Sequence, residues 1–151
     1  MKRIFFLIPL LLLGACNAIP TIEPTATISK PFVIRSVENS FSPRPEDGNL
    51  QIGGVEIASM DLSEITNVEP TRVQLTFLGS MPRACNELRI DVSPPDEQYQ
   101  IQVEIYSLVD TKVECENVFQ QFEASVLLGL YSPGRYTVWV NGGLIGDFVT
   151  Y

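Results

Sequence analysis

The sequence predicts an all-β domain, an antiparallel β-sandwich of about seven strands, preceded by a signal peptide and a Pro/Thr-rich linker. Two observations lead to this fold class. From Leu50 onward, apolar and polar residues alternate with a period of two, which places one set of side chains on each face of a strand. These alternating runs are short, and they are separated by Gly, Pro, Asn and Asp, the residues that form turns.

Residues 1–15 have the pattern of an export signal. A short basic start precedes an apolar run over residues 4–13, which is too short to span ~30 Å of hydrocarbon as a finished helix. The run ends in Leu13-Gly14-Ala15-Cys16, which resembles the lipobox of bacterial lipoproteins. The resemblance implies that the chain is cut before Cys16 and that acylated Cys16 anchors it, outside the cytoplasm, to the cell membrane or outer membrane. An ordinary secreted protein with Cys16 as a spare thiol is the alternative.

The residues from Cys16 onward divide into a stalk and a domain. Residues 16–49 hold the lipidated cysteine, a stretch rich in Pro and Thr, and a transitional segment. The prolines prevent a helix, so the stretch is interpreted as an extended spacer of at most ~3.1 Å per residue. Residues 32–34 suit an additional edge strand. The β-sandwich domain itself is expected over residues 50–151.

The strands of the domain follow from the alternation. They are expected at residues 50–57, 73–77, 88–92, 101–105, 122–128, 136–140 and 144–151. The pair Gly53-Gly54 interrupts the first run and shifts its phase, which predicts a β-bulge. The last two strands are separated by Asn141-Gly142-Gly143, the strongest hairpin signal in the chain, which we expect to form a three-residue loop.

Composition excludes several classes of function. The chain has no histidine, which removes Ser-His-Asp and Cys-His nucleophilic sites. Its formal net charge is −8, without a basic cluster, so we expect no nucleic-acid partner, because that binding depends on Lys and Arg. Cys85 and Cys115 are expected to form a disulfide in an oxidising compartment. A metal site on these two cysteines is a weaker alternative because nothing completes four ligands, and we expect no metal and no cofactor.

Residues 132–136, Ser-Pro-Gly-Arg-Tyr, resemble the tyrosine corner of immunoglobulin-like sandwiches. The resemblance implies an immunoglobulin-like sandwich in which the Tyr136 hydroxyl bonds to the backbone a few residues upstream. A wider pattern, formed by residues 79–85, Cys115, Phe122-Glu123 and residues 133–142, resembles a group of bacterial proteins that carry a lipobox and an immunoglobulin-like domain. No activity comes with this resemblance, so it implies a fold and a location only.

The last hairpin offers a candidate binding face. If Tyr136 faces the core, then Thr137 and Trp139 face outward, and a three-residue loop pairs Trp139 with Ile145 and Thr137 with Asp147. We therefore expect a face made of Thr137, Trp139, Ile145 and Val149. Exposed Trp in an apolar patch is typical of a partner site. The alternatives are that residues 32–41 cover this face or that Trp139 is half-buried.

These observations favour a membrane-anchored, non-enzymatic binding or structural module whose partner is an envelope protein or a peptide. No catalytic residue is predicted. The alternative is a surface hydrolase that uses carboxylates, which would need two close acids in a cleft, one with a raised pKa. Acidic turn residues such as Asp96 and Glu97 are interpreted as solvated charges, with a calcium site as the weaker reading.

Overall fold

The computed structural model describes residues 30–151. The predicted signal peptide, the lipidation site Cys16 and most of the stalk lie outside these residues. The described chain forms ten strands and one short 3-10 helix. They are β1 (Val33–Arg35), η1 (Pro45–Asn49), β2 (Gln51–Gly53), β3 (Glu56–Ile65), β4 (Arg72–Met81), β5 (Glu87–Val92), β6 (Gln100–Val109), β7 (Gln120–Leu127), β8 (Leu130–Tyr131), β9 (Gly134–Val140) and β10 (Gly143–Thr150).

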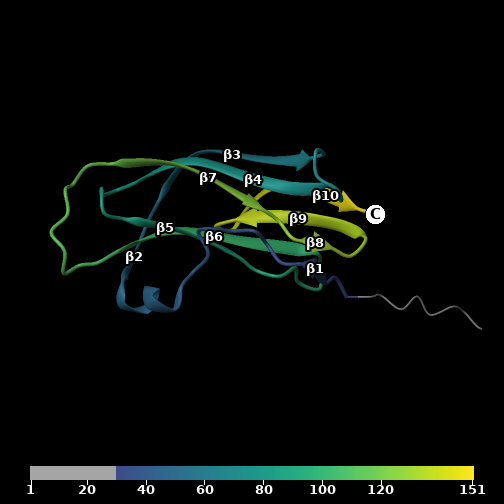
Figure 1. Cartoon of the computed structure of the whole chain (residues 1–151), viewed down its shortest axis with the longest axis horizontal. Helices are drawn as coiled ribbons and strands as arrows, with labels where there is room; N and C mark the ends of the chain where they lie inside the picture. The colour runs from purple at the N-terminus through teal and green to yellow at the C-terminus, as the bar shows by residue number, and fades with distance from the viewer. Residues whose placement is uncertain (1–29) are drawn as a thin grey trace, which may run out of the picture.

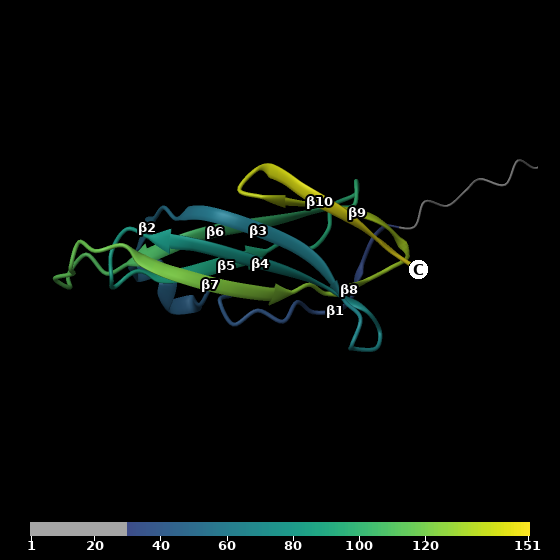
Figure 2. The same cartoon turned by 90° about the horizontal axis from the view of Figure 1, so that it is seen from above.

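The strands form two sheets that pack face to face (Figures 1 and 2). One sheet has the order β10-β9-β6-β2, with β5 along the other edge of β6. The other has the order β3-β4-β7, and the short strands β1 and β8 pair with each other at one end. All pairs are antiparallel except β6 with β9, which run parallel. The predicted all-β antiparallel sandwich is therefore confirmed. No helix in residues 30–151 has the length and apolar character needed to cross a bilayer.

The core lies between the two sheets and follows the predicted alternation. In β4 and β7 the buried positions include Leu75, Phe77 and Val126, and in β9 they include Tyr136 and Val138, each fully shielded from solvent. Their sequence neighbours on the same strands point outward and are partly or fully exposed. The period-two pattern thus places one side of each strand in the core.

The first predicted strand is divided between the two sheets. Residues 50–57 do not form one strand with a β-bulge, as Gly53-Gly54 suggested. Instead β2 ends at Gly53 and pairs with β6, whereas β3 begins at Glu56 and pairs with β4 of the opposite sheet. A Cβ atom on Gly53 would lie 2.9 Å from the Ser107 hydroxyl oxygen, so the chain passes too close to β6 for a larger residue. The shift of phase therefore marks a crossing between sheets.

The segment before residue 50 belongs to the domain, in contrast to the expected boundary. Strand β1 pairs with β8, and the Ile90 amide donates to the Phe41 carbonyl at 3.0 Å. Val33, Val37 and Phe41 pack against the core. The physical reason is that the backbone at Val33 and Phe41 pairs with the edges of β8 and β5, although Pro43, Pro45 and Asp47, which follow, resemble a loop in sequence. The domain therefore includes residues 33–49.

A single side chain completes the edge of β6 between its two neighbours. Strand β9 pairs with the start of β6 and β2 with its end. Between them, the Asn141 side chain accepts a hydrogen bond from the Ile105 amide at 2.8 Å and donates one to the Ile105 carbonyl at 3.1 Å. The Asn141 amide group thus occupies the position that a neighbouring strand's peptide group would take.

Candidate functional site

The turn between β9 and β10 determines which side chains share the predicted binding face. It contains two residues, Asn141 and Gly142, with φ angles of 47° and 81°. Two consecutive left-handed residues form the type I′ turn that Asn-Gly favours, because its twist matches that of the flanking strands. Val140 consequently pairs with Gly143. The expected three-residue loop is wrong.

This turn changes the partner of Trp139. Trp139 lies opposite Leu144, not Ile145, and the register shifts between Leu144 and Gly146. Ile145 lies in this irregular step and packs against the core. Beyond it the predicted register is restored, since Thr137 pairs with Asp147 as expected. The shorter turn and the bulge compensate each other, so only the partners of Val140 and Trp139 differ from the prediction.

The four predicted face residues are therefore not brought together. Trp139 is half-buried, and its indole nitrogen donates to the Thr137 hydroxyl at 3.1 Å. Val149 is exposed but lies opposite Arg135, two rows away from Trp139. An ion pair 2.8 Å long joins Arg135, on the row of Val149, to Asp147, on the row between Val149 and Trp139. The apolar part of this face consists of Trp139 and Leu144, which is 57% exposed and was not predicted.

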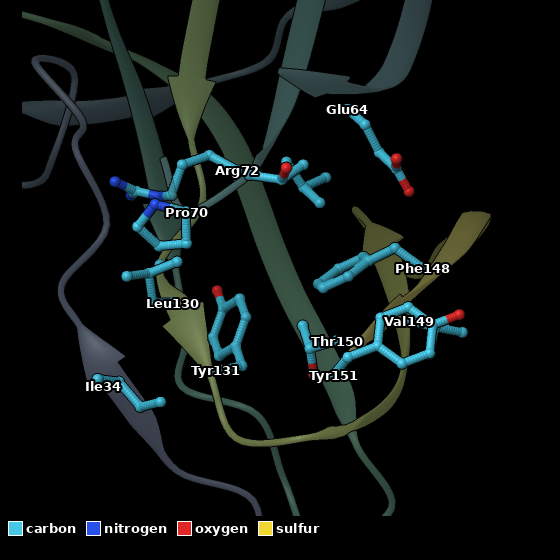
Figure 3. A pocket seen from close by; sticks show the side chains of 13 residues that line it. Ile34, Glu64, Pro70, Arg72, Leu130, Tyr131, Phe148, Val149, Thr150 and Tyr151 are labelled. Atoms are coloured by element: carbon cyan, nitrogen blue, oxygen red, sulfur yellow. The ribbon is translucent and has the colours of Figure 1, made fainter. Parts of the chain in front are cut away.

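A pocket of about 420 Å³ opens at the end of the sandwich where β1, β8 and the C-terminal end of β10 meet (Figure 3). Its walls come from segments far apart in the sequence: β1, the end of β3, the loop before β4, the start of β4, β8 and β10. Most of the side chains that form it are apolar. They include Ile34, Pro70, Val73, Leu130, Tyr131 and Phe148.

Three aromatic rings form a cluster behind this pocket. Tyr136 lies between Tyr131 and Phe148, with ring centroids 5.0 Å and 5.4 Å away, respectively. The Tyr136 hydroxyl donates to the Ser132 carbonyl oxygen at 2.8 Å and lies 3.0 Å from the Ser132 hydroxyl. This is the bond that the tyrosine-corner interpretation predicts, and it holds β9 against the turn that follows β8.

Tyr131 differs from Tyr136 in the hydrogen bonding of its hydroxyl group. The residue is only 5% exposed, and its hydroxyl has no hydrogen-bond partner in the described part of the chain. Burial raises the pKa of Tyr131 to about 12, although the nearby Gly129 backbone, which is not in hydrogen-bonding geometry, opposes that rise. The hydroxyl therefore stays protonated at neutral pH. A buried, unpaired hydroxyl costs about 1–3 kcal/mol of stability.

The cation among the residues that line the pocket, Arg72, is already engaged in hydrogen bonds. Arg72 is buried, and each of its three guanidinium nitrogens already donates a hydrogen bond. Two of them bond to the Leu128 carbonyl oxygen and the third to Glu38. Glu64 is the one carboxylate side chain among the residues that line the pocket, and it is exposed. The pocket is thus apolar inside, with a negative charge at its edge.

The structure offers little for acid–base or metal chemistry within residues 30–151. No group of three His, Cys, Asp or Glu side chains there is placed to hold a metal ion. Asp47 bonds to Arg89 through both carboxylate oxygens, each at 2.7 Å. These bonds hold the pKa of Asp47 at about 2, against an ordinary value of 3.8, which is the direction opposite to that of a general acid.

Cys85 and Cys115 form a disulfide, in agreement with the predicted pairing. Cys85 lies in the loop before β5 and Cys115 in the loop between β6 and β7. Figure 1 shows the long loop that leads into β7 at the opposite end of the sandwich from the C-terminus. The disulfide thus braces the end of the domain that lies away from the pocket.

Comparisons with known proteins give a family but no close relative. Neither the curated proteins nor the solved structures contain a match to this chain. The model of one family, described as the ORF11 beta-sandwich domain, matches residues 75–150, which is half of the chain and runs from within β4 to the end of β10. The matched region includes the disulfide, the Tyr136 corner and two of the strands that form the pocket, β8 and β10. The chain belongs to the ORF11 beta-sandwich domain family.

Proposed function

We propose that this protein is a membrane-anchored, extracytoplasmic lipoprotein whose β-sandwich is a non-enzymatic binding module. The binding role rests on one observation above the others, the largely apolar pocket that Tyr131, with its buried and unpaired hydroxyl, helps to line. Its volume of about 420 Å³ falls within the ~300–1,000 Å³ of typical small-molecule sites. A pocket with mostly apolar walls and a few polar groups suits recognition of a small ligand or one segment of an envelope partner.

The proposed location rests on the sequence and on the disulfide. The motif Leu13-Gly14-Ala15-Cys16 supplies the acylation site, and the Pro/Thr-rich residues after it supply the spacer. The bridge between Cys85 and Cys115 lies near the surface, and such disulfides persist outside the reducing cytoplasm. Two or three acyl chains hold a protein on a bilayer far more firmly than a single chain.

A carboxylate-dependent hydrolase fits the pocket less well. Glycoside hydrolysis needs two carboxyl groups on either side of the scissile bond, and Glu64 stands alone among the lining residues. Glu64 is also exposed, whereas a general acid near neutral pH needs burial or a like charge to raise its pKa. We therefore favour binding over hydrolysis.

The test of the anchor compares two substitutions that each remove one cysteine. Cells that express Cys16→Ser should accumulate unprocessed precursor without labelled palmitate. The matched variant Cys85→Ser keeps the lipobox and should be labelled and processed like the wild type. Label on Cys16→Ser, with cleavage at the normal position, would disprove the lipoprotein assignment.

A further inference from the structure

The pocket at the β1–β8 end contains one feature that packing alone leaves unexplained. Tyr131 is 95% buried and its ring packs against Tyr136, yet its hydroxyl makes no hydrogen bond within residues 30–151. Phenylalanine would provide the same packing without the cost of an unpaired hydroxyl. Figure 3 shows the hydroxyl end of the Tyr131 ring pointing toward the side of the pocket that holds Leu130 and Pro70. The hydroxyl oxygen is shielded from solvent, so a ligand in the pocket reaches it only when a covering side chain moves aside.

The surrounding charges restrict that ligand to a neutral one. An anion would have to compete for Arg72 with Glu38 and the Leu128 carbonyl oxygen, to which the guanidinium is already bonded. Glu64 at the edge repels carboxylates and phosphates. The Tyr131 hydroxyl remains protonated and can donate a hydrogen bond, so the complementary group is a neutral acceptor such as a carbonyl oxygen.

The lining restricts the rest of the ligand to hydrocarbon. The side chains of Ile34, Val73, Leu130 and Phe148 offer no hydrogen bond, so a polar group placed against this part of the lining would lose its hydration without compensation.

The position of β1 relates the pocket to the bilayer, and this step rests on the proposed anchor. Ile34 follows Cys16 by 18 residues. A connection of that length spans at most about 60 Å when fully extended. Acylated Cys16 would thus keep the pocket close to a surface made of acyl esters.

We infer that this pocket binds the acyl chain of a neutral fatty-acyl ester, with the Tyr131 hydroxyl donating a hydrogen bond to the ester carbonyl oxygen. The hydrocarbon chain packs against Leu130 and Phe148. The hydroxyl oxygen is shielded from solvent in the structure, so the ester carbonyl must displace a covering side chain to reach it. The ester comes either from a phospholipid of the bilayer or from a soluble acyl compound.

The experiment uses the full-length acylated protein in phosphatidylcholine vesicles and three photoreactive probes with the same dodecyl chain. The probes are a methyl ester, a free carboxylate and an alkane. After photolysis, mass spectrometry maps the label along the chain as the probe concentration increases. The variant is Tyr131→Phe. The matched control is Tyr106→Phe, because Tyr106 lies on β6 and does not line this pocket.

The ester should label residues 128–131 and 148–151 saturably, at roughly 3- to 10-fold lower concentration than the alkane, the effect of one hydrogen bond. Tyr131→Phe should abolish that difference and leave alkane labelling unchanged, whereas Tyr106→Phe should behave like the wild type. Because Tyr131→Phe removes an unpaired hydroxyl, its melting temperature should not fall, which separates lost binding from misfolding. Vesicles whose phospholipid carries the photoreactive chain should label the same residues if the bilayer supplies the ester, and only the added ester should do so if the source is soluble.

Equal labelling by ester and alkane, the strongest labelling by the carboxylate, or an ester preference that survives Tyr131→Phe would overturn the inference. The anchor and the pocket fail separately. A Cys16→Ser chain that loses palmitate but is still labelled by the added ester retains the pocket function. An acylated wild-type chain that is not labelled at these residues has an anchor without this ligand.

Discussion

Tyr131 and Tyr136 allow a test of what one buried hydroxyl contributes when everything else is alike. Both residues are buried, and their ring centroids are 5.0 Å apart in the same aromatic cluster. The Tyr136 hydroxyl donates to the Ser132 carbonyl oxygen at 2.8 Å, whereas the Tyr131 hydroxyl has no partner among the described residues. Substituting each by Phe removes one oxygen atom and keeps the ring. We expect the two substitutions to change the free energy of unfolding in opposite directions.

The magnitudes follow from what each hydroxyl leaves behind. Tyr136→Phe removes the buried bond to the Ser132 carbonyl and the contact with the Ser132 hydroxyl, but the carbonyl still accepts a hydrogen bond from the Thr150 hydroxyl at 2.6 Å. The acceptor is not left unpaired, so the expected loss is about 1–1.5 kcal/mol, the contribution of one ordinary hydrogen bond. Tyr131→Phe removes a polar group that was buried without a partner. We expect a gain of about 1 kcal/mol, the lower end of the desolvation cost of such a group.

The assay is equilibrium urea unfolding of the full-length protein in detergent, followed by circular dichroism. The slope with urea should be the same for both variants, so that a shift of the midpoint reports stability. The two urea midpoints should lie on either side of the wild-type midpoint. The free energies of unfolding of the two variants should differ by about 2–2.5 kcal/mol. If Tyr131→Phe destabilised the protein as much as Tyr136→Phe does, the Tyr131 hydroxyl would be paired in solution, and the reasoning would be refuted.

Three further predictions concern the rest of the domain. Reduction of the disulfide between Cys85 and Cys115, which are 30 residues apart, should lower the free energy of unfolding by about 3–4 kcal/mol on the chain-entropy estimate, and an unchanged urea midpoint in reductant would contradict this. Because the pKa of Asp47 is lowered to about 2 from 3.8, its bond to Arg89 should contribute full stability above about pH 4, and this contribution should disappear as the pH falls through 2. Asp47→Asn should lack this part of the acid dependence when urea midpoints are compared between pH 2 and 5. Half-buried Trp139 should be only partly quenched by acrylamide, and Trp139→Ala should cost about 1 kcal/mol, whereas a loss of ~3–5 kcal/mol would show a core residue.

The sequence predicts the core of this fold well because burial in a sandwich has a period of two. Tyr136 and Val138 on β9, and Leu75 and Phe77 on β4, are buried as the alternation requires. The pairing of Cys85 with Cys115 also follows from the cysteine count. Both predictions depend only on local pattern or on the absence of competitors, so they need no knowledge of how distant segments meet.

The hairpin shows where such reasoning fails. A loop that is one residue shorter than predicted and a bulge at Ile145 compensate each other, so Thr137 still faces Asp147 while Trp139 exchanges its neighbour. No local pattern distinguishes a three-residue loop from a two-residue turn followed by a bulge, because Gly142 and Gly143 suit both.

The pocket was beyond prediction for a different reason. Its walls combine Ile34, Pro70, Leu130 and Phe148, which no periodicity relates. Leu130 and Tyr131 form a strand of only two residues, too short to produce an alternating signal. A sequence signal for Tyr131 was equally lacking, since a tyrosine at a core position gives no indication whether its hydroxyl is paired.

Asn141 fulfils two requirements at once, and this limits which residues can replace it. Its φ angle of 47° alone would also accept Gly or Asp, the other common residues of the type I′ turn. Its side chain, however, both accepts from and donates to Ile105, which neither of those residues can do. Glycine would preserve the turn and expose a peptide group of β6 to pairing with another chain, and aspartate would set a carboxylate against the Ile105 carbonyl. One amide side chain therefore links the shape of the hairpin to protection of the sheet from self-association.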